Sequence, residues 1–379
     1  LVLGRSAAAS PYLPIDDSTI LERVPARAAL ERLAPLRDAV AAHPTDLPAT
    51  LALAKGYIEI GRRDADPRFV AYAEAVLRPW LSNTNPPESA LVLQATALQY
   101  LHQFKAALAL LDEALVRQPL DGQAWLTRAA LLELTGQYPD ARRACARIAR
   151  TVDELVALTC LTSVDSRAGR LAASYAALRG VASIDPRLPA PVRSWMLSVL
   201  ADMAERSGDD HAAEADLKDA LTAVPDDPYL RATYADLLLR LDRPAEVIAL
   251  LKGSEAQDPL LLRLAIAGKR SGNSGAERWA ALYQERLRAA RRDRDYTHRR
   301  EEAMFLLEVA GDAQAALKAA AENWAAEQRE PPDVRIYAAA AARAVAREDL
   351  RLLGSWIAAT RYEDLTLRPV PALAAMRLP

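Results

Sequence analysis

Prolines that end apparent helices recur along this chain and restrict the folds that it can adopt. The prolines that follow apparent helices are separated by 33, 67, 39, 34 and 72 residues at Pro86, Pro119, Pro186, Pro225, Pro259 and Pro331. Two of these spacings are about double the others, so the underlying period is about 34 residues. Glycines stand about midway between such stops at Gly136, Gly169, Gly208, Gly272 and Gly311. Each unit is therefore predicted to contain a helix, a turn, a second helix and a stop.

The apolar pattern within one unit indicates two packed helices. In residues 88–119, Leu91, Ala95 and Leu98 share one face of a first helix. Ala107 and Leu111 share one face of a second helix. Small residues on both faces let the helices approach closely. A single thin pair cannot bury its apolar surface alone, so we expect neighbouring units to stack.

The unit at residues 122–153 resembles a known repeat. Trp125, Ala129 and Leu132 precede the turn glycine Gly136, and Ala141 follows it. This order resembles the tetratricopeptide repeat (TPR) family, whose period is about 34 residues. The resemblance covers about residues 49–360 in roughly nine units, although Asp242 stands where glycine is usual and the late units keep only the spacing. It implies an all-α fold, a right-handed α-α superhelix of antiparallel helix pairs.

Three regions are expected along the chain. Residues 1–24 are predicted to be an extended N-terminal segment, residues 25–361 a single solenoid with a capping helix, and residues 362–379 a C-terminal tail. Leu1–Leu3, followed by small residues, is consistent with the remnant of an export signal, although a trimmed chain looks the same. The segments 104–108 and 323–331 also look similar to uncharacterised exported repeat proteins of bacteria. We therefore expect a periplasmic or otherwise exported protein, with a cytoplasmic one as the alternative.

Composition narrows the classes of partner. Only 14 of 379 residues are glycine, 51% are hydrophobic, and the net charge is −2. No apolar stretch reaches the ~18 residues of a transmembrane helix. A near-neutral chain has no general attraction to nucleic acid or anionic membranes. The sequence therefore predicts a helical protein that meets its partners through local surfaces.

Two cysteines and four scattered histidines give no metal-ligand spacing, so we expect no metal. Cys145 and Cys160 lie at similar distances from a predicted turn and could touch. They can form a disulfide in an oxidising compartment, or they can be two small buried apolar residues. The sequence leaves both alternatives open.

Known catalytic signatures are absent from the sequence, including GxGxxG, GxxxxGK[ST], HExxH and GxSxG. We therefore expect no enzyme activity, no cofactor and no small-molecule substrate. In stacked helix pairs the first helices line a concave side, which is the default binding surface. Polar residues near that side make it acidic, and we predict a peptide or partner protein as its ligand. The candidate groove residues are Thr162, Asp165, Trp195, Asp202, Glu205, Asp236 and Arg240.

Residues 286–300 hold seven arginines against Asp293 and Asp295. This density suggests an alternative function, an intracellular regulatory adaptor that contacts acidic protein or nucleic acid through this patch. Arginines at a helix end, with Glu301 and Glu302 beginning the next helix, are also typical of a solvated helix junction. We favour the junction over nucleic-acid binding, and a scaffold in a bacterial cell envelope over the adaptor.

Overall fold

The computed structural model describes residues 28–64, 66–149, 154–182, 188–292, 298–368 and 370. Within them the regular elements are all helices. In the N-terminal half they are α1 (Ala28–Arg32), α2 (Ala34–Ala42), α3 (Leu47–Asp64), α4 (Arg68–Leu81), α5 (Glu88–Tyr100), α6 (Phe104–Arg117), α7 (Gly122–Leu134), α8 (Tyr138–Ile148), α9 (Glu154–Ser166) and α10 (Leu171–Ala182). None of these described helices is long and apolar enough to cross a membrane.

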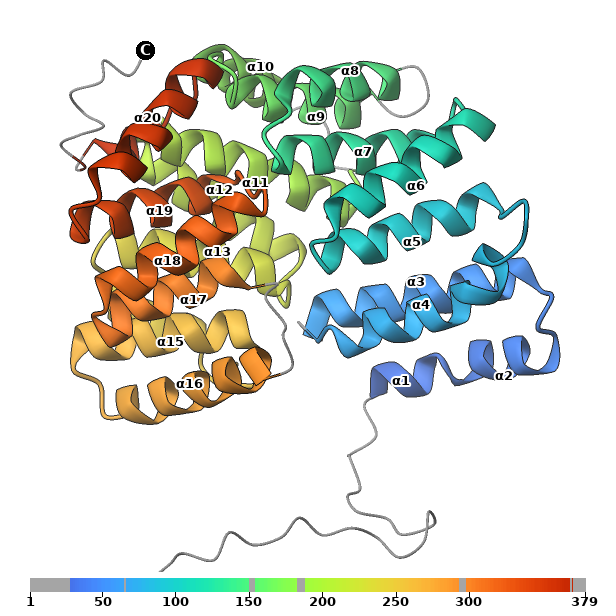
Figure 1. Cartoon of the computed structure of the whole chain (residues 1–379), viewed down its shortest axis with the longest axis horizontal. Coiled ribbons are helices and arrows are strands. Elements are labelled where there is room, and N and C mark those ends of the chain that lie inside the picture. Colours follow the sequence, from blue (N-terminus) through green and yellow to red (C-terminus); the bar gives the residue numbers. More distant parts are fainter. Residues whose placement is uncertain are drawn as a thin grey trace, which may run out of the picture.

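The C-terminal half continues the same pattern. Its helices are α11 (Ala190–Arg206), α12 (Asp210–Ala223), α13 (Pro228–Arg240), α14 (Pro244–Leu250), α15 (Asp258–Ser271), α16 (Ala276–Arg292), α17 (Arg299–Phe305), the π-helical turn η1 (Leu306–Ala310), α18 (Ala313–Ala325), α19 (Pro331–Arg343), α20 (Arg347–Thr360) and the 3₁₀ turn η2 (Leu365–Leu367). The described part of the chain thus forms helix pairs from α3–α4 to α19–α20, stacked in sequence order (Figure 1).

Small side chains set the contacts within and between these pairs. Ala95 on α5, Ala107 on α6, Ala129 on α7 and Ala141 on α8 are all 0% exposed. The apolar side chains form a series of clusters along the stack instead of one central core. This is the packing of a solenoid, in which each unit buries its apolar surface against its neighbours. The predicted all-α superhelix is therefore the observed fold.

The turns between paired helices need a left-handed backbone. Gly136 supplies it between α7 and α8, with φ of 75°. Asp242, which stands where glycine was expected, adopts the same conformation with φ of 56°. Asp tolerates this region better than most side chains because its carboxylate can bond locally. Departure from the repeat signature at this position therefore leaves the turn unchanged.

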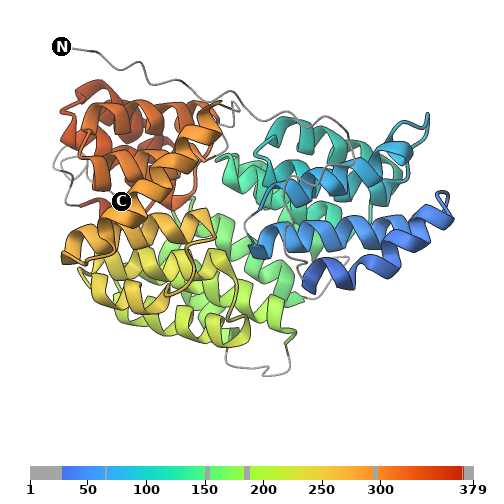
Figure 2. The ribbon, with the colours of Figure 1, turned by 90° about the horizontal axis from the view of Figure 1, so that it is seen from below.

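The superhelix closes on itself, which the sequence analysis did not anticipate. We call α3–α8 the N-terminal arm and α15–α20 the C-terminal arm. Both views show the two arms side by side, joined through α9–α14 (Figures 1 and 2). The backbone N–H of Arg329 donates to the carbonyl of Leu134 at 2.8 Å, and the side chain of Gln257 donates to the carbonyl of Arg63 at 2.9 Å. We call the contact between residues 102–138 and residues 326–356 the seam.

Residues 362–368, at the start of the predicted C-terminal tail, pack against the rest of the chain. Tyr362 is 0% exposed, and Asp364 and Leu367 are also buried. The carbonyl of Glu363 accepts a hydrogen bond from Arg206 on α11, and its carboxylate accepts one from the backbone N–H of Leu171. The start of the tail therefore turns back onto the middle units of the stack. Residues 371–379 and the predicted extended segment 1–24 lie outside the described residues.

Candidate functional site

The carboxylates predicted to line an open groove instead form internal ion pairs. Asp202 lies 3.0 Å from Arg206 on its own helix. Glu205 lies 2.6 Å from Arg335 of α19, and Asp236 lies 2.6 Å from Arg263 of α15. Burial acts to raise the pKa of Asp202, but Arg206 and neighbouring arginines outweigh it and lower this pKa. The Glu205–Arg335 pair joins distant units, whereas the other two pairs lie within α11 and between the neighbouring helices α13 and α15.

The other predicted groove residues also have partners within the chain. The buried Thr162 hydroxyl donates to the carbonyl of Leu158 at 2.8 Å. Asp165 accepts from Arg142 of α8, and Arg240 pairs with Glu205. Trp195 is half-buried between two apolar clusters. The structure differs from the expected open groove because the last units fold back over α9 and α11. They do so because curvature accumulates along the stack.

Cys145 and Cys160 form a disulfide. It joins α8 to α9, and the two Cα atoms lie 5.6 Å apart. Both cysteines are buried. The bridge therefore ties two consecutive helix pairs in the middle of the stack.

Most described arginines in the 286–300 patch are paired. Arg286 contacts Asp258, Arg291 contacts Glu302, and Arg300 lies 2.8 Å from Glu330. Residues 293–297 lie outside the described residues. The paired part of the patch therefore serves as the helix junction that its flanking glutamates indicated.

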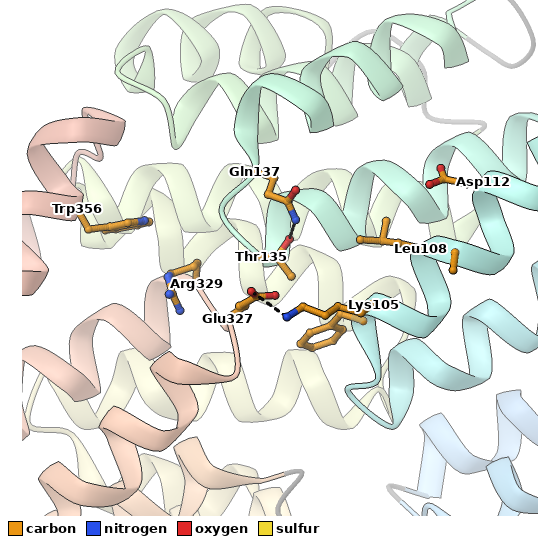
Figure 3. Close-up of a pocket in the computed structure, with 10 residues that line it drawn as sticks. Lys105, Leu108, Asp112, Thr135, Gln137, Glu327, Arg329 and Trp356 are labelled. Carbon is orange, nitrogen blue, oxygen red and sulfur yellow. Dashed lines mark hydrogen bonds and ion pairs between the residues drawn. The ribbon is translucent and has the colours of Figure 1, made fainter.

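A pocket of about 610 Å³ opens at the seam (Figure 3). Its walls come from α6, the α7–α8 turn, the loop before α19, and α20. The lining residues are Phe104, Lys105, Leu108, Ala109, Asp112, Thr135, Gln137, Glu327, Arg329 and Trp356. Figure 3 shows Trp356 and Arg329 on one side, Leu108 and Asp112 on the other, and the Lys105–Glu327 pair between them. The volume is in the range of ligand pockets, about 300–1,000 Å³.

The pocket combines apolar surface with paired charges. Phe104, Leu108 and Trp356 provide the apolar surface. The ammonium of Lys105 lies 3.3 Å from the carboxylate of Glu327, and Asp112 accepts a hydrogen bond from Arg128 at 2.8 Å. This mixture suits a ligand with both an apolar and a polar part.

Histidines lie at the edge of the seam, close to the pocket. The Nδ1 atom of His102 lies 3.0 Å from the side-chain nitrogen of Gln328, and its ring stacks on Phe104. The ring of His298 approaches edge-on, with centroids 5.9 Å apart. Burial and then the neighbouring His298 lower the pKa of His102 to about 4. The closed seam therefore favours the neutral imidazole.

None of the pocket residues was among the predicted site residues. Lys105 and Glu327 are more than two hundred positions apart in the sequence, and no repeat motif relates them. Within the described residues no group of His, Cys, Asp and Glu side chains is arranged to hold a metal ion.

No protein-family model and no curated protein sequence matches this chain. Among solved structures it is similar to the human IFIT1 dimer with PPP-AAAA, with a TM-score of 0.46 and 14% identity over 92% of this chain and 85% of that one. Yeast Tom70 has a TM-score of 0.41 and 10% identity over 92% and 84%. The APC/C hetero-tetramer Cut9-Hcn1 has a TM-score of 0.40 and 13% identity over 82% and 52%. The fold assignment rests on the helix pairs described above.

Proposed function

We propose that this protein is a non-catalytic scaffold that binds a segment of a partner protein, and that the pocket at the seam is the binding surface. The observation that carries the proposal is the pocket itself, which both arms build from apolar and charged side chains. The acidic residues expected in the concave groove, such as Asp202 and Asp236, then act at a distance from the partner. They hold the stacked units in place so that the two sides of the pocket meet.

The geometry of the pocket supports a protein ligand. Ala109 and Gln137 are exposed, and Lys105 is 85% exposed, so the pocket opens onto the molecular surface. An extended peptide can lie in such an opening, with one side chain against Trp356 and its backbone along the polar rim. A partner with basic side chains would complement an acidic groove, but this partner has less support because the groove carboxylates are already paired with arginines.

A photo-cross-linking residue placed in the pocket tests this function. Ala109 and Ala106 are both exposed on α6, but only Ala109 lines the pocket. We expect p-benzoylphenylalanine at position 109 to cross-link a partner protein in native extract, and the same residue at position 106 to give no such product. The cross-linked peptide of the partner is identified by mass spectrometry. Identical products from both positions, or none from either, would contradict the proposal.

We also propose that the protein works in an oxidising compartment such as a bacterial cell envelope. The Cys145–Cys160 bridge supports this location, because disulfides persist in such compartments and are rare in a reducing cytosol. Alkylating the protein directly in the cells that make it tests the proposal. We expect both cysteines to resist alkylation until a reductant is added after denaturation. Full alkylation without a reductant would place the protein in a reducing compartment.

A further inference from the structure

One wall of the seam pocket carries an arginine that is held in a fixed position. The guanidinium of Arg329 lies over the ring of Trp324, 3.7 Å from its centroid. Its Nη1 atom donates to the carbonyls of Trp324 and Gln328 at 2.6 and 2.9 Å. Its backbone N–H donates across the seam to Leu134. This side chain has therefore already lost much of the rotamer freedom that binding a ligand would otherwise remove.

The guanidinium of Arg329 keeps a free donor edge. Among the described residues no carboxylate forms an ion pair with it, whereas Lys105 and Asp112 in the same pocket both have partners. Its Nε and Nη2 atoms make no hydrogen bond to described residues. Neither of these atoms is fully buried, so both are open to solvent. Burial lowers the pKa of Arg329, and the charges of the nearby carboxylates Asp333 and Glu327 offset this lowering only in part. Arginine stays charged in proteins, so this edge of the guanidinium is a donor pair for an anion.

Apolar surface lies next to this cation. A Cβ built on Gly136 would lie 3.0 Å from Cγ of Arg329 and 3.7 Å from Nε1 of Trp356, so the two side chains flank the same glycine. Leu108 faces them from α6 (Figure 3). Phe104 of the same helix also lines the pocket. When a residue of a bound peptide contacts Arg329, the neighbouring residue of the same peptide can therefore reach this apolar surface. The pocket is open to solvent, so a peptide chain can continue beyond it.

We propose that the pocket recognises an internal acidic residue of the partner segment that stands next to a bulky aliphatic or aromatic residue. The carboxylate binds the Nε and Nη2 edge of Arg329 in a bidentate pair, and the apolar side chain packs against Trp356 and Leu108. The inference rests on the proposed function, because it names the chemistry that the same pocket selects. It also gives a role to the free donor edge of Arg329 in the pocket.

Selection from a library of short random peptides with amidated C-termini tests this inference. We expect the peptides enriched on the wild-type protein to carry Asp or Glu beside Leu, Phe or Trp. The best peptide is then measured by calorimetry in a double-mutant cycle that combines its Glu→Gln variant with Arg329→Gln. Each single change is expected to weaken binding about tenfold or more, and the two changes together little further. Arg351→Gln is the matched control, because Arg351 is exposed on α20 outside the pocket.

The outcomes separate this inference from the proposed function. Enriched peptides without acidic residues, or an affinity that Arg329→Gln leaves unchanged, would overturn the inference while leaving a peptide-binding scaffold in place. A preference for a free terminal carboxylate over an internal acidic residue would also overturn it. Failure to enrich any peptide would overturn the function together with the inference. The peptide's own Glu→Gln variant keeps the test valid if Arg329→Gln disturbs the seam.

Discussion

At the residue scale, buried alanines recur at the start of the second helix of a pair. Ala107 on α6, Ala141 on α8 and Ala213 on α12 are 0% exposed and follow the turns of their units. An alanine has no atom beyond Cβ, so the partner helix approaches without a gap. The repeat in the sequence is therefore marked by small side chains as well as by turn residues.

Enlarging these alanines should destabilise the fold. We expect Ala141→Leu, Ala107→Leu or Ala213→Leu to reduce the free energy of unfolding by about 1–3 kcal/mol, because the added carbons must push the packed helices apart. Urea unfolding followed by circular dichroism measures the effect. Ala106→Leu is the control, because Ala106 is exposed on the same helix as Ala107. Equal effects at positions 106 and 107 would show that the faces of α6 are assigned wrongly.

At the element scale, the turns show which departures from the repeat signature are tolerated. Val345, between α19 and α20, has φ of 56° in a position that glycine fills elsewhere. A β-branched residue in this left-handed region is strained. Because Val345 is 73% exposed, its side chain gains little from packing in return.

Replacing Val345 with glycine should therefore stabilise the protein. We expect Val345→Gly to increase the free energy of unfolding by about 1 kcal/mol, since glycine adopts a positive φ without a steric cost. Val345→Ala should recover less, because alanine still has a Cβ. Thermal and urea unfolding of the three proteins measure the order. A glycine variant that is less stable than the valine protein would contradict this account of the turn.

The helix pairs were predictable because local residues determine them. Leu91, Ala95 and Leu98 indicate one face of α5, and Gly136 indicates one turn, without reference to distant parts of the chain. The seam was not predictable on the same basis. Lys105 meets Glu327 only because small rotations between successive units add up over the intervening repeats. For the same reason the pairing of Glu205 on α11 with Arg335 on α19 could not be predicted from the sequence.

At the scale of the whole molecule, the closed seam depends on neutral groups as well as on ion pairs. His102 contacts Gln328 and faces charged neighbours from several elements: His298, Arg300, Glu301 and Glu330. Its pKa is lowered to about 4 from an ordinary value near 6.5. The closed form therefore binds a proton on this imidazole more weakly than the opened form does.

Mild acid should weaken the seam through His102. Its contribution to stability is fully present above about pH 6.5 and is lost as the pH falls toward about 4. We expect the Tm of the wild type to fall more between pH 7.5 and 4.5 than that of His102→Asn, because asparagine does not titrate and tolerates the positive φ at this position. An equal fall in the two proteins would contradict the assignment. Comparing the two proteins cancels the effect of the other titrating groups.

The two arms of the chain meet at the seam, where Lys105 of the N-terminal arm forms an ion pair with Glu327 of the C-terminal arm. A carbodiimide joins an amine and a carboxylate only when they are in contact, and these groups lie 3.3 Å apart. Lys218 and Glu214, 2.7 Å apart within α12, provide an internal control that does not depend on closure. We predict that mass spectrometry of the cross-linked monomer finds both the 214–218 and the 105–327 bonds. Finding the first without the second would contradict a closed superhelix and the pocket that it builds.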